Sequence, residues 1–430
     1  MSKLISSTLE QICLHEKRAI ISGPFGSNIS SKFFVESGIP VIRGNNLSLD
    51  YDKFFDDHFV FVTPQKADEL KCYAYRNDLI FTAAGTIGQV GVIPENSRYT
   101  KYVISNKQIR ARIDTKKIDL LYAYYWFSSP WIRAFLIRNN KGSTVPLLTL
   151  SEIKDLPIIY PESIDEQKTI ISVIDNISKK IEINKKINDY LEEQLQLLYD
   201  YWFTQFNFPD DDGQPYKASN GLMVWNENIN HIIPAGWQVK PMGTICSFRN
   251  GINYNKNVEG NTTYKIINVR NISSSTLFLD ESNFDEICLP RQQGDKYCVS
   301  DESIIIARSG IPGATRILCN PSSNIIFCGF IICCTPYNNT LQNYLTLYLK
   351  QFEGSSATQT GGSILKNVSQ ETLKNLLVPI PPQSLLNQFN DSVSHIYNLI
   401  IGNIKENVQL TTLRDWLLPM LMNGQATIED

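Results

Sequence analysis

Val41-Ile42-Arg43-Gly44-Asn45-Asn46-Leu47-Ser48 is echoed 225 residues later by Ile266-Ile267-Asn268-Val269-Arg270-Asn271-Ile272-Ser273. The same shift aligns Leu79-Ile80-Phe81-Thr82-Ala83-Ala84-Gly85-Thr86-Ile87-Gly88 with Ile304-Ile305-Ile306-Ala307-Arg308-Ser309-Gly310-Ile311-Pro312-Gly313. Farther on, Lys154-Asp155-Leu156 aligns with Lys374-Asn375-Leu376, and Pro161 with Pro381, at a shift of 220. Solenoid repeats have much shorter periods. The chain therefore contains two copies of one domain, each followed by a helical segment.

Each copy is followed by a heptad pattern whose spacings alternate between 4 and 3. The first pattern consists of Ile170, Ile174, Ile177, Ile181, Asn184, Asn188, Leu191, Leu195, Leu198 and Trp202. The second, shifted by 219, consists of Phe389, Val393, Ile396, Ile400, Asn403, Asn407, Leu410, Arg414, Leu417 and Leu421. Such a seam is typical of long helices that pack on each other.

Two asparagines interrupt each apolar seam at matching positions. A buried asparagine costs stability but fixes the register of paired helices. Antiparallel pairing would place Asn184 near Asn407 and Asn188 near Asn403, with the two domains at opposite ends of the rod. Alternatively, each seam packs on its own domain and the asparagines face water. Gly402 and Pro419 are expected to weaken the second helix.

These patterns predict an α+β fold of two mixed α/β domains joined by two long helices that pack as an antiparallel coiled coil. The predicted segments are a first domain (1–160), a central helix (161–205), a linker (206–233), a second domain (234–382) and a C-terminal helix (383–430). In the first domain, β-rich runs are expected at 41–42, 59–62, 78–81, 90–93 and 109–113. The aromatic segment 120–139 is expected to form one helix that packs in the core, in preference to stacking on bases.

Composition and charge limit the class of protein. Hydrophobic residues make up 43% of the 430 residues and charged residues 19%, as in an ordinary folded protein. Net charge is +5 in 1–160 and +2 in 234–382, against −4 in 161–205, −3 in 206–233 and −3 in 383–430. A polyanion would be drawn to the two domains, although chance scatter of surface charge is the alternative for so small an excess.

The N-terminal sequence has no apolar signal segment and the chain has no long apolar run, so a cytoplasmic protein is expected. The nine cysteines have no framework spacing, and Cys328, Cys333 and Cys334 are expected to be buried free thiols. Without a CxxC pair, and with four scattered histidines, no zinc site is expected.

Motifs of catalysis are missing from the sequence. It has no Gly-rich phosphate loop ending in Gly-Lys-Ser/Thr, no GxSxG elbow and no HExxH helix. Ile380-Pro381-Pro382-Gln383 is the nearest match to the Asn/Asp-Pro-Pro-aromatic motif of amino-methyltransferases, and is better explained as a turn that starts a helix. Gly23-Pro24-Phe25-Gly26-Ser27 is favoured as a plain turn over a phosphate cradle, and Asp210-Asp211-Asp212 as a solvated run over a cation site.

Several motifs, in this order and together with the duplication, resemble one family. They are Gly23-Pro24-Phe25-Gly26-Ser27 followed by Gly38-Ile39-Pro40-Val41-Ile42-Arg43, Glu166-Gln167-Lys168, Phe206-Asn207-Phe208-Pro209 with Tyr216-Lys217, and Ile233-Pro234-Ala235-Gly236-Trp237. The chain resembles the specificity subunit of type I restriction-modification systems over essentially its whole length. The second copy departs from the pattern, because it has Phe248-Arg249-Asn250-Gly251-Ile252-Asn253-Tyr254 in place of the Gly-Pro-Phe-Gly turn, and its helix starts with Asn387-Gln388. Such divergence fits two different half-sites, and drift explains it equally.

The resemblance implies a non-catalytic subunit that reads double-stranded DNA through two target-recognition domains, one for each half of a bipartite site. Its helices would set the spacer and dock two DNA methyltransferase subunits, with two restriction subunits as an optional addition. S-adenosylmethionine, ATP and Mg²⁺ would belong to those partners, so no cofactor is expected in this chain. The competing hypotheses are a coiled-coil interaction scaffold without DNA readout and, last, a single-chain enzyme.

Base readout needs Arg, Lys, Asn or Gln on loops beside rigid strands. Candidates in the first copy are Ser27, Asn28, Arg43, Asn45, Asn46, Lys107, Gln108, Lys141, Ser143 and Thr144. Candidates in the second copy are Asn253, Tyr254, Lys256, Arg270, Asn271, Arg308, Ser309, Gln359, Thr360 and Lys366. For Asn46 and Asn271, the alternative is that each simply holds a turn.

Overall fold

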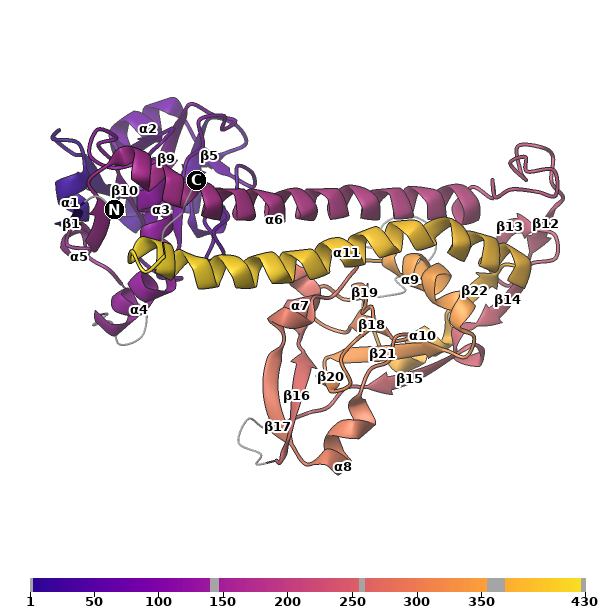
Figure 1. Ribbon diagram of the computed structural model, residues 1–430. Helices are drawn as coiled ribbons and strands as arrows, with labels where there is room; N and C mark the ends of the chain where they lie inside the picture. Colours follow the sequence, from indigo (N-terminus) through magenta and orange to yellow (C-terminus); the bar gives the residue numbers. More distant parts are fainter. Residues whose placement is uncertain (1–2, 140–146, 255–259, 354–367, 427–430) are drawn as a thin grey trace. The chain divides into compact units, whose positions relative to one another are not determined.

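The computed structural model describes residues 3–139, 147–254, 260–353 and 368–426. The chain divides into two compact units. Unit 1 comprises residues 1–182 and 409–430, and unit 2 comprises 183–408. Both boundaries fall inside the two long helices, α6 (Ile164–Tyr199) and α11 (Gln383–Met422), which Figure 1 shows as the longest ribbons. Each unit therefore contains one globular copy together with part of each long helix.

Unit 1 holds three sheets. A four-stranded sheet has the order β2-β10-β7-β8, a five-stranded sheet the order β3-β5-β4-β9-β6, and β1 pairs with β11. The strands are β1 (Leu4–Thr8), β2 (Ile20–Ser22), β3 (Phe34–Val35), β4 (Ile39–Ile42), β5 (Val60–Val62), β6 (Tyr73–Tyr75), β7 (Leu79–Thr82), β8 (Val90–Val92), β9 (Lys101–Ile104), β10 (Gln108–Ala111) and β11 (Pro157–Pro161). The five predicted β-rich runs correspond to β4, β5, β7, β8 and β10.

The helices of unit 1 lie between and beside these sheets. They are α1 (Leu9–Ile12), η1 (Gly26–Ile29), η2 (Ser31–Phe33), η3 (Gly44–Asn46), α2 (Pro64–Leu70), α3 (Leu120–Phe127), α4 (Pro130–Asn139) and α5 (Leu150–Lys154). The prediction of one helix over 120–139 was wrong, because the helix breaks at Ser128 and Ser129 and restarts at Pro130, whose missing N–H suits a first helical position. Tyr124 and Tyr125 are fully buried, which excludes them as surfaces for base stacking.

Unit 2 repeats the four-stranded sheet and the two-stranded pair of unit 1, but its other sheet has three strands in place of five. Its four-stranded sheet has the order β15-β21-β18-β19, its three-stranded sheet the order β17-β16-β20, and β14 pairs with β22. The strands are β12 (Met223–Asn226), β13 (His231–Pro234), β14 (Gln238–Pro241), β15 (Cys246–Asn250), β16 (Thr262–Ile267), β17 (Asp285–Leu289), β18 (Ile304–Ala307), β19 (Thr315–Ile317), β20 (Ile325–Phe327), β21 (Ile331–Pro336) and β22 (Leu377–Ile380). In both copies the parallel pair, β4 with β9 and β16 with β20, occupies the same place, which confirms the duplication.

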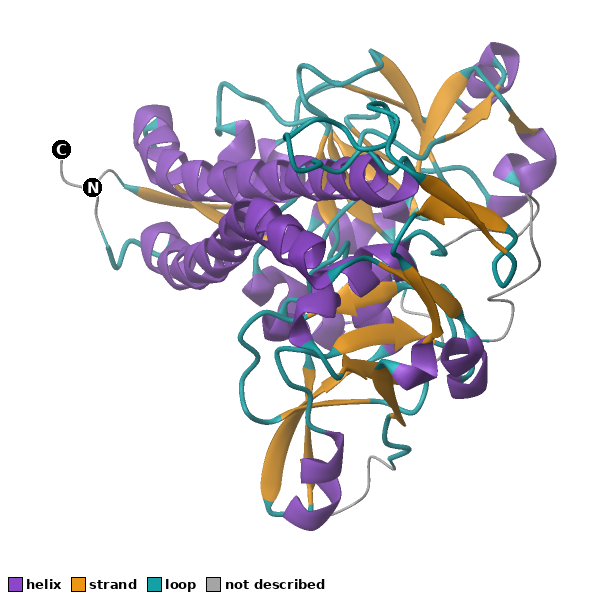
Figure 2. Ribbon diagram, turned by 90° about the vertical axis from the view of Figure 1, so that its right-hand side faces the viewer, coloured by secondary structure: helices purple, strands orange, loops and turns teal. Residues whose placement is uncertain are grey.

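The helices of unit 2 include one that links its sheet to the long helices. They are η4 (Asp200–Thr204), η5 (Met242–Thr244), α7 (Val269–Ser274), η6 (Glu281–Asn283), α8 (Arg291–Gly294), η7 (Asp295–Tyr297), η8 (Asn339–Leu341), α9 (Gln342–Lys350) and α10 (Gln370–Asn375). Tyr344 of α9 packs edge-on against Phe203, at a centroid distance of 4.8 Å, and also contacts Tyr199. Figure 2 distinguishes the strands, in orange, from the helices, in purple.

Between η4 and the second copy, residues 206–233 are more ordered than the predicted linker. Phe206, Phe208 and Ile233 are buried, and Phe206 packs edge-on against Trp237 at 5.5 Å. Hairpin β12–β13 lies in this segment as well. The acidic run, by contrast, forms only a turn, in which Asp210 Oδ1 accepts from the backbone N–H groups of Asp212 and Gln214.

The two asparagine layers confirm the antiparallel pairing within unit 2. Asn184 donates to Asn407 Oδ1 at 2.9 Å, and Asn403 donates to Asn188 Oδ1 at 2.8 Å. Asn184 is fully buried, so the alternative of asparagines facing water was wrong. The seams also pack on their own domains, since Phe389, Val393 and Ile400 share the core of unit 2. α11 runs without a break through Gly402 and Pro419.

Candidate nucleic-acid interface

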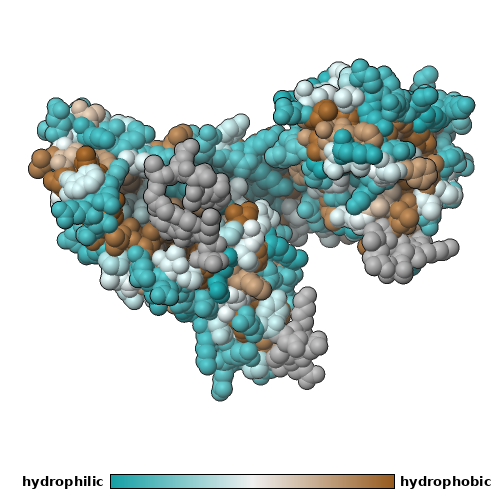
Figure 3. All heavy atoms as spheres, turned by 180° about the vertical axis from the view of Figure 1, so that it is seen from behind, coloured by the Kyte–Doolittle hydropathy of each residue, from teal (hydrophilic) through white to brown (hydrophobic). Residues whose placement is uncertain are grey.

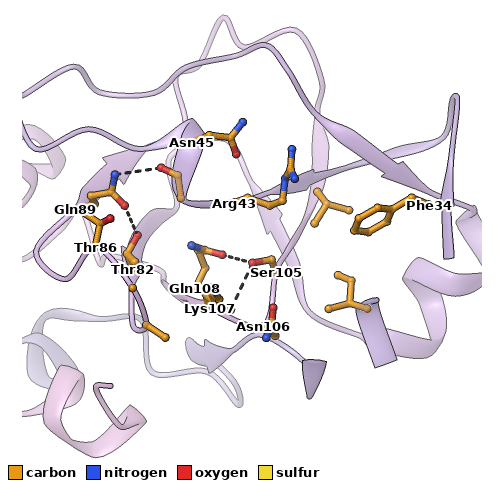
Figure 4. Close-up of a pocket in the computed structure, with 15 residues that line it drawn as sticks. Phe34, Arg43, Asn45, Thr82, Thr86, Gln89, Ser105, Asn106, Lys107 and Gln108 are labelled. Atoms are coloured by element: carbon orange, nitrogen blue, oxygen red, sulfur yellow. Dashed lines mark hydrogen bonds between the residues drawn. The ribbon is translucent and has the colours of Figure 1, made fainter. Parts of the chain in front are cut away.

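Three separate chain segments of unit 1 meet at one edge of its sheets and enclose a cavity of about 540 Å³ (Figure 4). The segments follow β4, follow β7 and connect β9 to β10. The lining residues are Ile29, Phe34, Val41, Arg43, Gly44, Asn45, Thr82, Ala84, Gly85, Thr86, Gln89, Ser105, Asn106, Lys107 and Gln108. Four sequence-predicted candidates, Arg43, Asn45, Lys107 and Gln108, are thus brought together.

The strand pairing explains why these segments meet. β4 and β9 are parallel neighbours, so their carboxyl ends lie at the same edge. The N–H of Ser105 continues that ladder by donating to Ile42 O at 2.9 Å. β10 pairs in turn with β7, which places Gln108 opposite Thr82. The cavity is therefore a consequence of the sheet topology.

Two glutamines form part of the polar lining (Figure 4). Gln89 Nε2 donates to Gly44 O at 3.1 Å and to Leu47 O at 3.0 Å, which leaves its Oε1 to accept from the Thr82 hydroxyl at 3.0 Å. The hydroxyl of Ser105 donates to Gln108 Oε1. Both amides are consequently held in one orientation, with the nitrogen of Gln108 left as a donor.

That nitrogen has no partner among the described residues, nor has Arg43 Nε. Gln108 is only 1% exposed, so an unmet donor there carries a desolvation cost of about 1–3 kcal/mol unless a ligand or water accepts from it. The lining includes two cationic side chains, Arg43 and Lys107, and no carboxylate. The pocket consequently suits a group rich in hydrogen-bond acceptors or negative charge.

Asn46 and Asn271 have the turn-holding role that was the alternative to DNA contact. Asn46 is fully buried and donates to Phe55 O at 3.0 Å and Asp57 O at 2.9 Å, while its Oδ1 accepts from Arg43 N. Asn271 is 5% exposed and makes the matching bonds to Asn283 O and Asn268 N. Both amides are committed to the backbone, which favours the turn-holding role over DNA contact.

The remaining described candidates of the first copy lie nearby. Ser27 and Asn28 are exposed on η1. A methyl group on Gly26, in the same turn, would lie 3.1 Å from Asn106 Nδ2 of the pocket. Asn45 is exposed and donates weakly to His58 O at 3.4 Å, and Arg43 Nη2 donates to the same carbonyl at 3.3 Å. These side chains form one polar rim.

In the second copy, the candidates lie in two groups. Arg308 is exposed and donates to Gly329 O at 3.2 Å, and the Asn253 amide lies against the same glycine. Tyr254 and Ser309 are half-buried neighbours of these two in sequence. Arg270, on α7, instead forms an exposed ion pair with Asp285. Lys141, Ser143, Thr144, Lys256, Gln359, Thr360 and Lys366 lie outside the described residues.

The framework of the edge is the same in both copies, whereas its polar side chains are not. Thr82 and Gln89 are replaced in register by Ala307 and Ala314, since Ala307 N donates to Ala314 O as Thr82 N does to Gln89 O. The ladder β10–β7 matches β21–β18, so Gln108 corresponds to Ile331. The other correspondences in that loop are Ser105 with Cys328, Asn106 with Gly329, and Lys107 with Phe330, which is 63% exposed.

Sequence reasoning missed Gln89, Ser105, Asn106 and the pocket itself. Thr82 belongs to the echoed segment but was treated only as part of a strand. Gln89 follows the echo by a single residue, and its role depends on the carbonyls of Gly44 and Leu47, far away in sequence. A comparison of the two copies, position by position, could have identified these sites as positions where the first copy has a polar residue and the second copy a different one. Within the described ranges, no cluster of His, Cys, Asp and Glu could hold a metal ion, and no helix is long and apolar enough to cross a membrane.

A family model and two similar proteins point to the same protein family. Residues 8–193 and 234–405 match the type I restriction modification DNA specificity domain. The type I restriction enzyme MjaIX specificity subunit of Methanocaldococcus jannaschii is 25% identical over 358 residues, covering 83% of this chain and 79% of that protein. The HindI specificity subunit of Haemophilus influenzae is 22% identical and covers 67% of this chain and 73% of its own length.

Among solved structures, the S subunit of the type I restriction-modification system from M. genitalium aligns over 98% of this chain and 96% of its own, with 16% identity and a TM-score of 0.47. The family match spans both copies and most of the chain. The chain therefore belongs to the type I restriction-modification specificity subunits, the non-catalytic component that gives these systems their DNA sequence specificity.

Proposed function

We propose that each copy reads one half of a bipartite DNA site and that the two long helices set the gap between the halves. The observation that carries this is the duplicated sheet edge, which keeps its backbone framework and changes its side chains. Two similar surfaces with different chemistry suit two different short sequences on one duplex. The net positive charge of residues 1–160 and 234–382 supports attraction to phosphates.

The residues proposed to contact DNA in the first copy are the rim side chains Ser27, Asn28, Arg43, Asn45 and Lys107, together with Gln108 inside the pocket. In the second copy they are Asn253, Tyr254, Arg270, Arg308 and Ser309. Arg and Lys suit guanine or phosphate, and Asn and Gln suit adenine. Lys141, Ser143, Thr144, Lys256, Gln359, Thr360 and Lys366 remain proposed contacts from the sequence alone.

The DNA methyltransferase subunits are proposed to dock on the long helices. In unit 2, α6 and η4 carry a second heptad stripe, called here the docking stripe: Ile183, Ile187, Tyr190, Leu197 and Tyr201. These side chains are between 41% and 67% exposed, although their spacing is that of a helix seam. An apolar stripe of this kind favours a partner helix over water. Two methyltransferases and, optionally, two restriction subunits would complete the assembly.

A second exposed apolar area lies on hairpin β12–β13, where Trp225 and Ile232 are cross-strand neighbours, 59% and 48% exposed. Figure 3 shows brown side chains over this hairpin at its left-hand end. A pure scaffold would need such surfaces too. It would not need a polar pocket with unmet donors, and that pocket favours DNA readout over the scaffold hypothesis.

Alanine substitution at Arg43 and at Arg270 tests the assignment of halves. Each variant is assembled with its methyltransferase. Arg43→Ala should weaken recognition of the first half-site and Arg270→Ala that of the second, and the methylation that depends on that half-site should fall by a factor of about ten or more. A good base contact contributes about 1–3 kcal/mol. Lys154→Ala and Arg291→Ala remove equal charge at exposed ion pairs and serve as controls. Unchanged site-specific methylation in both arginine variants would remove these two residues from the readout.

A further inference from the structure

The pocket of unit 1 has the size and the polarity of a ligand site. Its volume of about 540 Å³ falls within the roughly 300–1,000 Å³ typical of sites for small organic molecules. A fully buried amide, Gln108, directs an unpaired N–H toward it. An acceptor from a bound ligand would satisfy that donor.

The two glutamine heads present a donor and an acceptor side by side. Gln89 is fixed by two backbone carbonyls, so its Oε1 faces the pocket and accepts from the Thr82 hydroxyl, with a second lone pair available to a ligand. A methyl group on Gly44 would lie 3.4 Å from Gln89 Oε1 and 4.0 Å from Gln108 Nε2. A donor next to an acceptor is the pattern that a nucleobase edge matches.

The rest of the lining fits the other parts of a nucleotide. Phe34 lies on the side of the pocket opposite Gln89 and Thr82 (Figure 4), and with Ile29 and Val41 it gives an apolar wall for the face of a base. Arg43 and Lys107 are the cationic groups of the lining, and no carboxylate opposes them. A phosphate attached to the base would therefore meet favourable charge.

The second copy shows that none of these polar groups is required by the fold. At matching positions it has Val269 for Gly44, Ala307 for Thr82, Ala314 for Gln89 and Ile331 for Gln108, on the same strands with the same ladder bonds. Ile331 is fully buried in an apolar core. The polar lining of the first copy consequently has a cause other than folding.

We propose that the pocket of unit 1 binds one nucleotide, with its base edge at Gln89 and Gln108, its base face along Phe34 and its phosphate at Arg43 and Lys107. The favoured source of this nucleotide is the DNA of the first half-site, from which one base would be unstacked, and that part rests on the proposed function. A free mononucleotide offers the same chemistry. The second copy has Ala314 and Ile331 in place of the two glutamines, so it would read its half-site without this pair of amides.

The test uses two variants that install the residues of the second copy, Gln108→Ile and Gly44→Val. The first removes the unpaired donor, and the second fills the space beside both amides while leaving the glutamines in place. Gln293→Ile, at an exposed glutamine of α8, is the matched control. Thermal melting of each full-length variant, together with methylation through the second half-site, establishes that the variant is folded.

Two readouts separate the sources. In the first, 2-aminopurine replaces one base at a time in the first half-site of a duplex bound by the methyltransferase complex, and its fluorescence reports unstacking. In the second, the four free mononucleotides are titrated into the protein without DNA. We expect either a fluorescence rise at one position or saturable binding of a mononucleotide, weakened about ten- to hundredfold in both pocket variants and unchanged in Gln293→Ile.

Neither signal in the wild-type complex, or a signal that both pocket variants retain, would overturn the proposal. Failure of the proposed function is recognised separately, because the wild-type complex would then methylate no bipartite motif at all. A complex that methylates both half-sites, without unstacking and without nucleotide binding, would retain the reader function and contradict the pocket assignment alone.

Discussion

Asn184 of α6 donates a side-chain N–H to Asn407 of α11 at 2.9 Å, and Glu406 accepts from the same amide at 2.7 Å. The next layer is formed by Asn403 and Asn188, at 2.8 Å. Two polar layers in succession allow only one register of the antiparallel pair, because a shift of either helix would bury amides against leucine or isoleucine. The asparagine layers thereby fix the axial register of the two helices in addition to their pairing.

Replacing Asn407 by leucine should destabilise unit 2 by about 0.5–1.5 kcal/mol, since it removes one of the two acceptors of the fully buried Asn184 amide and leaves Glu406 as the other. Replacing Asn184 and Asn407 together should recover most of that loss, because two leucines pack without unmet polar groups. Denaturant titration of the two single variants and the double variant measures the coupling. Additive losses would show that the asparagines do not act as a pair.

Substitution of Gly23 or Gly251 by alanine should strongly destabilise the protein. A Cβ at Gly23 would lie 1.8 Å from Ser105 O, and one at Gly251 2.1 Å from Cys328 O. Each N–H also donates to the adjacent strand, Gly23 to Gln108 O and Gly251 to Ile331 O. Gly23→Ala and Gly251→Ala should each cost about 3 kcal/mol or more through backbone displacement.

Gly402→Ala is the control for that experiment, since nothing lies within 4 Å of the position on α11 where its Cβ would be. Alanine there should raise stability by about 1 kcal/mol through helix propensity. Equal effects of all three substitutions on the melting temperature would contradict the close approach of the strands.

A buried ion pair makes the second copy sensitive to acid. Arg316, 2% exposed, binds Glu353 through two hydrogen bonds of 2.7 and 2.8 Å. Burial tends to raise the pKa of Glu353, but the hydrogen bonds and charge of Arg316 outweigh it, so the pKa lies below the usual 4.5. The unfolded chain therefore takes up the proton first as the pH falls, and the stabilisation by this pair is lost below about pH 4.5.

Glu353→Gln should flatten the dependence of the unfolding midpoint on pH below about pH 4.5, where the wild-type pair loses its contribution. Glu353→Ala should cost about 3–5 kcal/mol at neutral pH, because Arg316 would remain buried without its carboxylate. The same acid-induced loss in wild type and the Gln variant would mean that other carboxylates dominate. Glu69, an exposed partner of Lys66, gives a control substitution with little expected effect.

The proposed spacer function predicts a change of DNA site on lengthening the helices. One heptad inserted after Glu182, with a second after Val408 to keep the asparagine layers in register, adds about 10.5 Å to the pair. At roughly 3.4 Å per base pair, the gap between half-sites should grow by about three base pairs. Insertion in α6 alone should instead disrupt pairing. An unchanged gap after the double insertion would show that the helices do not determine the spacing.

The parts of the fold that repeat within the chain could be predicted from the sequence. The heptad seams predicted the two long helices, their antiparallel pairing and the partners of Asn184 and Asn188. Heptad spacing determines directly which residues of two paired helices are in contact. The break between α3 and α4 was missed, since the apolar pattern continues across Ser128 and Ser129. The order of residues 206–233 was missed too, because Phe206 and Phe208 are buried by Trp237, a tertiary contact without a local signal.

The candidate site was predictable only in part. Arg43, Asn45, Lys107 and Gln108 were identified as polar groups on turns, and they share one pocket. Gln89 was not identified, because its carbonyl partners are 45 and 42 residues away in sequence. For Asn46 and Asn271 the sequence left both DNA contact and a turn-holding role open, since a sequence does not show whether a turn residue points inward. The equivalence of Gly23 and Gly251 emerged only from the strand registers.

Base-resolution methylation sequencing shows whether this chain reads a bipartite DNA sequence. DNA from cells that express the chain with its methyltransferase is compared with DNA from cells that lack only this chain. The account predicts two short half-sites separated by a fixed gap, methylated in the first sample and unmethylated in the second. An identical methylation pattern in both, with the methyltransferase active, would contradict it.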